Sequence, residues 1–219
     1  MHSQNSRREF VEIAAASFGV ITLTCSGVSL SDVSAAEKAN PVQPRKAGVP
    51  TGGRILVAYA SRCGSTVEIA QAVGRDLQSR DYRPEIVPVA RVSGVGAYQA
   101  VLLGSAVRAG NWLPEATGFV RQHRREIQNL PNAFFTVHMM NFGDDEKSRN
   151  GRRAYLNPIR ELVRPDIEVF FAGRVDLDRL SFGERLLCRI MGGAESRDLR
   201  NWPAIHAWGS GVFNSGVRS

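Results

Sequence analysis

The sequence has few cysteines and no low-complexity or repeated segment. Three cysteines in 219 residues are too few for the disulfide framework of a small secreted scaffold. Two of them, Cys63 and Cys188, remain if the first 35 residues are removed, and one bridge between them is compatible with an oxidising compartment. The absence of repeats and biased tracts excludes a solenoid and a mostly disordered chain.

Three common signatures of phosphate chemistry are also missing around "LVAYASRCGST", residues 56–66. A P-loop needs Gly-x4-Gly-Lys-Ser/Thr, and no lysine stands here. The dinucleotide fingerprint Gly-x-Gly-x-x-Gly is absent, because Gly94 and Gly96 match only its first two glycines and precede a strand. A Cys-x5-Arg phosphatase would need arginine where the chain has Ile69. A thiolate nucleophile at Cys63, activated by a helix end, stays open as an alternative.

Acidic residues are outnumbered, with 21 Asp and Glu against 28 Lys and Arg, which gives a net charge of +7. This balance favours anionic partners such as phosphate ligands, lipid headgroups or nucleic acid. The basic clusters "RQHRRE" and "SRNGRR" lack interleaved aromatic residues and match no nucleic-acid-binding module. We interpret them as solvated faces and expect no nucleic acid partner.

The first 35 residues have the layout of an export signal. Arg7 and Arg8 precede a charge-free run over 13–31, and small residues then permit cleavage after Ala35. The phrase "SRREFV" resembles the bacterial twin-arginine signal. We therefore predict that residues 1–35 direct export across the bacterial inner membrane. A retained membrane anchor is the alternative.

Strands alternate with helices five times after a predicted linker over 36–53. Apolar runs predict buried strands at 54–60, 83–92, 99–105, 132–139 and 167–175. Two prolines place the second strand at an edge of the sheet. Helical spacing extends over 67–80, 113–128, 154–163, 180–192 and 201–211. The alternation predicts an α/β domain over 54–213, with a five-stranded parallel sheet and helices on both faces.

The loop after the first strand is the candidate binding site. In an open parallel sheet, ligands bind beyond the carboxyl ends of the strands, and this loop also opens a helix. The N–H groups at a helix start attract an anion, and Gly64 permits its close approach. Ser61, Ser65 and Thr66 add hydroxyl donors, and Arg62 adds a positive charge. The loop is interpreted as a phosphate cradle, with an N-capped turn that binds no ligand as the alternative.

This loop resembles the phosphate loop of flavodoxins, Ser/Thr-x-Thr-Gly-x-Thr, with Cys63 in place of the middle threonine. One hydroxyl donor is therefore missing. Residues 98–123 and "PNAFFTVHM" look like segments of flavodoxin-fold protoporphyrinogen dehydrogenases of the menaquinone-dependent type, and 165–208 is similar to their C-terminal third. The likeness covers roughly 54–208 and implies the flavodoxin strand order 2-1-3-4-5.

The resemblance implies FMN as the cofactor, held by three loops. The first loop would bind the phosphate. The second, "GSAVRAGNW", would border the isoalloxazine ring with Trp112 stacked on it, and a core position for Trp112 is the alternative. The third, "VHMMN", would place two polar side chains near the pyrimidine edge, with a catalytic His138 as an alternative. The implied FMN contacts are Ser61, Arg62, Cys63, Gly64, Ser65, Thr66, Ser105, Ala106, Val107, Arg108, Gly110, Asn111, Trp112, Val137, His138 and Asn141.

The resemblance also implies an activity, that of an FMN-dependent oxidoreductase of the protoporphyrinogen dehydrogenase type. Hydride would pass from a porphyrinogen-like or other reductant to flavin N5, and quinone would then accept the electrons, with no metal and no nucleophilic side chain. An exported flavodoxin-like electron carrier is the alternative. Such carriers are typically acidic, whereas removing the signal with its two arginines and three acidic residues raises the net charge of this chain to +8.

Residues 180–191 add a possible membrane contact. Apolar residues cover one broad helical face there, and Arg185 and Arg189 lie together on the other side. This pattern predicts a peripheral helix at a membrane surface. A helix that packs on the core is the alternative.

Overall fold

The computed structural model describes residues 49–175 and 197–213. The predicted export signal (1–35), the first part of the predicted linker (36–48) and the predicted membrane-contact helix (180–191) lie outside the described residues. Within the described ranges, no helix combines the length and the apolar character needed to cross a bilayer.

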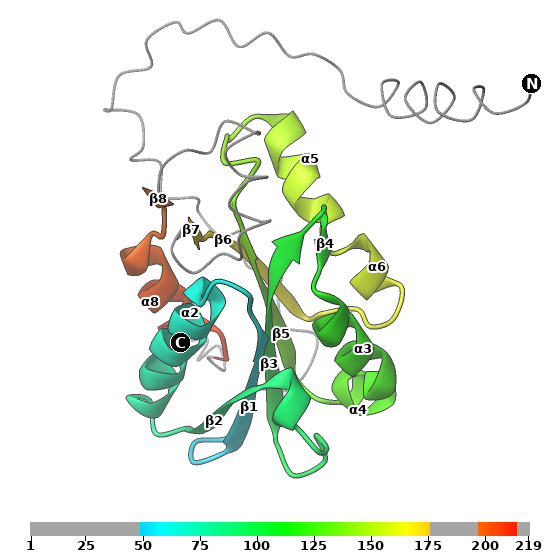
Figure 1. Ribbon diagram of the computed structural model, residues 1–219. Helices are drawn as coiled ribbons and strands as arrows, with labels where there is room; N and C mark the ends of the chain where they lie inside the picture. The colour runs from blue at the N-terminus through cyan, green and yellow to red at the C-terminus, as the bar shows by residue number, and fades with distance from the viewer. Residues whose placement is uncertain (1–48, 176–196, 214–219) are drawn as a thin grey trace, which may run out of the picture. The chain divides into compact units, whose positions relative to one another are not determined.

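A parallel sheet forms the centre of the fold (Figure 1). Its strands are β1 (Arg54–Ala60), β2 (Arg83–Pro88), β3 (Ala100–Arg108), β5 (Asn132–His138) and β6 (Ile167–Ala172). They pair in the order β2-β1-β3-β5-β6, every pair parallel. The predicted order 2-1-3-4-5 is thereby confirmed, because the added β4 (Asn111–Trp112) only pairs antiparallel with the end of β3. The proline-containing β2 lies at an edge, as predicted.

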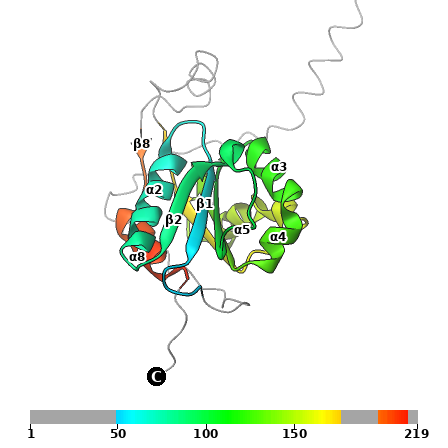
Figure 2. The same ribbon diagram turned by 90° about the horizontal axis from the view of Figure 1, so that it is seen from below.

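Helices cover both faces of the sheet (Figure 2). One face carries α2 (Ser65–Gln78) and α8 (Trp202–Gly211), and the other carries α3 (Pro114–Gln122), α4 (Arg124–Asn129) and α6 (Asn157–Arg160). The remaining elements are the 3-10 helix η1 (Val89–Arg91), α5 (Glu146–Ala154), β7 (Arg174–Val175) and β8 (Arg197–Asp198). The last two pair as a separate two-stranded antiparallel ribbon.

Each face of the sheet has its own hydrophobic core. Along β5, Phe135 packs toward α2 and α8, whereas its neighbour Phe134 packs toward α3 and α4, and both rings are fully buried. Leu102 and Leu103 divide between the two cores in the same way on β3. Since both faces are covered, the central strands are buried on both sides and mostly apolar, without an alternating polar face. Val49, five residues before the start of β1, is also buried in the first core.

Two of the predicted helices differ from the structure. The helix predicted over 113–128 breaks at His123, whose buried ring packs on Phe119 with 4.7 Å between the ring centroids, and α4 starts after it. The helix predicted over 154–163 is shorter in the structure, where only α6 (Asn157–Arg160) forms within it after a turn at 155–156, and the longer α5 precedes it. The sequence of α5 lacks apolar spacing and depends on its N-cap, where Asp145 accepts a hydrogen bond from the Ser148 N–H at 2.9 Å.

Close packing of Gly104 under the ring of Phe135 gives a stability prediction. A Cβ at position 104 would lie 1.8 Å from Cζ of Phe135, and this ring is held in the core. We expect Gly104→Ala to lower the free energy of unfolding by about 1–3 kcal/mol through overpacking. Urea denaturation measures the change. Gly118→Ala is the control, because a Cβ there meets nothing within 4 Å and alanine favours the helix. Equal loss of stability in both variants would contradict the prediction.

Candidate functional site

The carboxyl ends of β1, β3, β5 and β6 lie at one edge of the sheet. The strand register brings these ends level, pairing Ala60 with Ser105 and His138 with Ala172. The four connections that follow these strands therefore meet at the same edge, as in other open parallel sheets. They are the loop 61–64, the hairpin between β3 and β4, the loop 139–145 and the segment 173–175.

The loop 61–64 turns the chain from β1 directly into α2. Gly64 is the N-cap of α2 with φ at 86°, a left-handed conformation that glycine adopts without strain. Its N–H donates to Oγ of Ser61 at 3.1 Å, which closes the turn. No side chain caps the first turn of α2, so this helix start presents backbone N–H donors.

Thr66 gives the clearest sign of a ligand at this helix start. Its side chain is fully buried, and within the described residues its hydroxyl has no hydrogen-bond partner. Ser65 beside it is also buried and packs against the backbone at Gly173, where a Cβ would lie 3.3 Å from the serine Oγ. An unpartnered buried hydroxyl costs about 1–3 kcal/mol. A phosphate oxygen at the start of α2 would accept its hydrogen bond.

The second predicted loop is a tight β-hairpin. Arg108 of β3 pairs with Asn111 of β4, which leaves Ala109 and Gly110 as the two turn residues. Both have positive φ, 49° and 76°, as in a type I′ turn. Arg108, Gly110 and Asn111 are exposed at the edge of the sheet.

Ser105 and Trp112 hold the base of this hairpin from within the core. The Ser105 hydroxyl donates to the Ala106 carbonyl at 2.9 Å and accepts from the Leu113 N–H at 3.1 Å. Trp112 is only 3% exposed and donates from Nε1 to the Thr136 hydroxyl at 2.9 Å. Its ring also packs on a core phenylalanine. Trp112 thus takes the core position that was the alternative to stacking on a ring. Ala106 and Val107 are half-buried.

His138 lies at the end of β5 with 4% of its surface exposed. Its Nδ1 lies 2.6 Å from the Met140 carbonyl, which only accepts, so Nδ1 carries the proton. The pKa of His138 is lowered to about 4, chiefly by burial and to a smaller extent by the charge of Arg152, while the Met140 hydrogen bond opposes both. His138 is therefore neutral at pH 7. Stacking against Phe142 and contact with Tyr155 fix its ring.

Arg152 of α5 organises the loop 139–145. The arginine is 2% exposed, and its Nη1 donates to the carbonyls of Asn141 at 2.5 Å and Gly143 at 2.7 Å. Asn141 has φ at 62°, and its side-chain amide donates to the Tyr155 hydroxyl at 2.6 Å. At Gly151 a Cβ would lie 2.6 Å from that amide, so α5 packs tightly on the loop.

The predicted residues thus fall into three groups. Those of 61–66 form one loop, in which Arg62 is exposed, Cys63 is half-buried, and the two residues that start α2 are buried. Those of 105–112 lie at the end of β3 and on the adjacent hairpin. Val137 and His138 end β5, with Val137 in the core, and Asn141 lies on the third loop. The sequence reasoning missed three residues, Arg152, Tyr155 and Gly173. Arg152 belongs to the basic run "SRNGRR", whose composition is typical of a solvated face.

A family comparison identifies this arrangement. Residues 56–198 match the family model described as "Flavodoxin domain". The chain belongs to this family. Since the match covers more than half of the chain, the flavodoxin-like fold and the edge that carries the phosphate cradle have a common origin with the family.

Relatives of this flavodoxin domain include two proteins named protoporphyrinogen IX dehydrogenase [quinone]. The Leishmania major protein is 26% identical over 144 residues, which are 63% of this chain and 62% of that protein. The Escherichia coli K12 protein is 22% identical over 151 residues, 65% of this chain and 82% of that protein. The chain thus matches less than two thirds of the length of the Leishmania relative. Among solved structures, a flavodoxin from the domain Archaea is 16% identical to this chain. The match covers 64% of this chain and 94% of the archaeal chain, with a TM-score of 0.39.

FMN is the cofactor of this flavodoxin domain. Its phosphate fits the start of α2, where Thr66 offers a buried hydroxyl without a partner and Gly64 leaves the backbone uncovered. When bound, FMN supplies oxidation-reduction chemistry that no side chain of the chain provides. The cradle would hold the phosphate, and the hairpin and the third loop at the same edge of the sheet would border the rest of the flavin.

The buried hydroxyl of Thr66 predicts opposite effects on stability and binding. Thr66→Val removes an unpartnered hydroxyl from the apoprotein and a donor from the complex. We expect the free energy of unfolding of the apoprotein to stay level or rise by about 1 kcal/mol. FMN binding should weaken about 10- to 100-fold, the usual range for a hydrogen bond to a charged group. Urea denaturation and quenching of flavin fluorescence measure the two effects.

A matched variant on α3 controls for the general effect of this substitution. Thr117 is half-buried, and its hydroxyl bonds the Leu113 carbonyl within its own helix. Thr117→Val should leave FMN affinity within about twofold of the unmodified protein. Unchanged FMN affinity in Thr66→Val would contradict the assignment of the cradle.

The lowered pKa of His138 predicts a loss of stability in mild acid. Between pH 6.5 and about 4 the unfolded chain binds a proton at this position that the folded chain does not. This contribution is complete above pH 6.5 and falls by up to about 3 kcal/mol as the pH approaches 4. Urea denaturation across this range measures it. His138→Gln should flatten the curve by a similar amount, and parallel curves for the two proteins would contradict the prediction.

Proposed function

We propose that this flavodoxin domain is an FMN-dependent oxidoreductase of the protoporphyrinogen dehydrogenase type, with a porphyrinogen-like substrate and a quinone acceptor. Family membership supports the coarser statement, a flavin protein of oxidation-reduction or electron transfer. The two dehydrogenase relatives, matched over 144 and 151 residues, support the finer one.

The surface at the cofactor edge carries this proposal. Met140 and Phe142 of the third loop are 66% and 47% exposed, and they are two of the three exposed large apolar side chains within the described residues. Arg62 of the cradle loop and Arg108 of the hairpin are exposed at the same edge. A porphyrinogen has an apolar ring system and carboxylate substituents. Apolar side chains and arginines at the same edge of the sheet are suited to the two parts of such a molecule.

In this proposal the side chains of the protein would bind and orient the flavin and its substrate, and FMN, when bound, would supply the oxidation-reduction chemistry. His138, neutral and hydrogen-bonded through Nδ1 to the Met140 carbonyl, holds the third loop in place. Cys63 is half-buried at the cradle, and the reaction needs no thiol nucleophile. We assign no catalytic side chain.

The twin-arginine-type segment supports export of the domain in the same proposal, and residues 180–191 would contact the membrane in which quinone dissolves. An exported electron carrier without enzymatic activity is the second candidate. The net positive charge argues against it, since it favours an anionic substrate or surface.

Turnover by the FMN-loaded protein tests the proposal. With protoporphyrinogen and a soluble quinone under anaerobic conditions, we expect porphyrin fluorescence to rise together with quinol formation. Arg62→Gln and Arg108→Gln should each raise KM about three- to tenfold by removing a carboxylate contact. Cys63→Ser should keep its turnover. Arg121→Gln, near the end of α3, is the control for loss of a surface charge.

The same experiment separates the enzyme from the carrier. A carrier would show no turnover of protoporphyrinogen while still exchanging single electrons with a redox dye. That pair of results would contradict the proposed function and leave the FMN site intact.

A further inference from the structure

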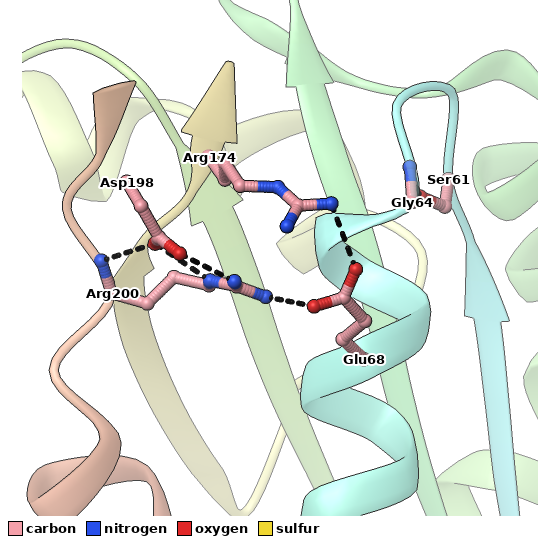
Figure 3. Close-up of polar contacts among 6 residues, drawn as sticks. All are labelled: Ser61, Gly64, Glu68, Arg174, Asp198 and Arg200. Atoms are coloured by element: carbon pink, nitrogen blue, oxygen red, sulfur yellow. Dashed lines mark hydrogen bonds and ion pairs between the residues drawn. The ribbon is translucent and has the colours of Figure 1, made fainter. Parts of the chain in front are cut away.

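An ion-pair cluster lies one helical turn below the phosphate cradle (Figure 3). Its central residue is Glu68, in the first turn of α2. The carboxylate accepts from Nη2 of Arg174 at 2.9 Å and from Nη1 of Arg200 at 2.5 Å. Arg174 belongs to β7, and Arg200 follows β8. The cluster therefore joins the β7–β8 ribbon to the start of α2.

Arg200 is the more firmly held of the two arginines. Its side chain is 4% exposed, and its Nε and Nη2 donate to the two carboxylate oxygens of Asp198 at 2.8 and 2.5 Å. Its guanidinium also lies 4.6 Å from the ring centroid of Trp202. Hydrogen bonds to Asp198 and Glu68 raise the pKa of Arg200, and the bond from Arg200 lowers the pKa of Asp198. This cation is permanent and fixed in position.

The Glu68 carboxylate and the phosphate of FMN would both lie near the N-terminus of α2. The Glu68 N–H donates to the Gly64 carbonyl at 3.1 Å, so the two residues are one turn apart, about 6 Å along the helix axis. An anion at either place is stabilised by the positive end of α2. Two anions together repel each other, and the repulsion is strong where water is partly excluded. A carboxylate here would oppose the phosphate unless nearby cations balance its charge.

We propose that Arg200, together with Arg174, makes this site selective for a phosphate-bearing flavin by neutralising Glu68. Arg200 is then a positioning and specificity residue that acts through Glu68. The packing of the Gly173 backbone on Ser65 holds the two arginines beside the cradle. The inference rests on the FMN site and is independent of the proposed reaction.

Binding of two flavins to Arg200→Gln and to a double variant tests this inference. FMN carries the phosphate and riboflavin lacks it, so only the affinity for FMN should depend on the charge at Glu68. We expect Arg200→Gln to weaken FMN binding about tenfold and to leave riboflavin binding within twofold. The double variant Glu68→Gln with Arg200→Gln should recover FMN affinity to within about threefold. Titration of the apoprotein by flavin fluorescence gives all the affinities.

A merely structural role of Arg200 predicts a different result. Loss of the ribbon's attachment would weaken both flavins equally, and removing Glu68 as well would not restore FMN binding. Either outcome overturns the inference. Arg75→Gln is the control for a lost charge on α2, because this exposed arginine lies in the last turn of the helix. It should change neither affinity by more than about twofold.

Glu68→Gln alone decides the question if Arg200→Gln does not fold. That variant removes the carboxylate and leaves both cations, so FMN should bind about two- to tenfold more tightly, with riboflavin unchanged. Weaker FMN binding would overturn the inference. The effect should also shrink at high salt, because screening acts on the charge and not on packing. Absent FMN binding by the unmodified protein would overturn the cofactor site itself, whereas absent turnover would concern only the reaction.

Discussion

The way α2 begins is the constraint on which the cofactor edge depends. Gly64 adopts a left-handed conformation and turns the chain from a buried strand into a helix within four residues. No side chain caps the helix, so its backbone donors face the edge of the sheet. The buried hydroxyl of Thr66 and the carboxylate of Glu68 then lie within the first turn. A ligand and the Glu68 carboxylate thus lie at one positive helix end, where Arg174 and Arg200 balance the charge of the carboxylate.

Much of the fold could be predicted because its strands are buried on both faces. Strands such as β1 and β5 are largely apolar and almost fully buried, and their alternation with helices leaves few topologies. The helices were less predictable. The break at His123 depends on a ring that packs on Phe119, a contact that spacing does not reveal. The helix α5 has almost no apolar residues, so its stability comes from Asp145 and from the buried Arg152.

The candidate site was predictable where backbone geometry defines it and unpredictable where packing does. Gly64 and Thr66 could be found from the strand-to-helix turn alone. Trp112 could not be placed, because an aromatic residue after a strand suits a ring stack and a core equally well, and only the bond to Thr136 decides its position. Glu68 and Arg200 are 132 residues apart, so no local pattern predicts that they meet.

The buried Arg152 has a consequence for how a ligand is received. Its two bonds to loop carbonyls, with Gly151 packed on Asn141, set the conformation of the loop 139–145 before any flavin arrives. The conformational entropy of this loop is therefore lost when the chain folds and not when the cofactor binds. The third loop is in this sense a preformed wall of the site, and its Met140 and Phe142 are exposed to solvent on it.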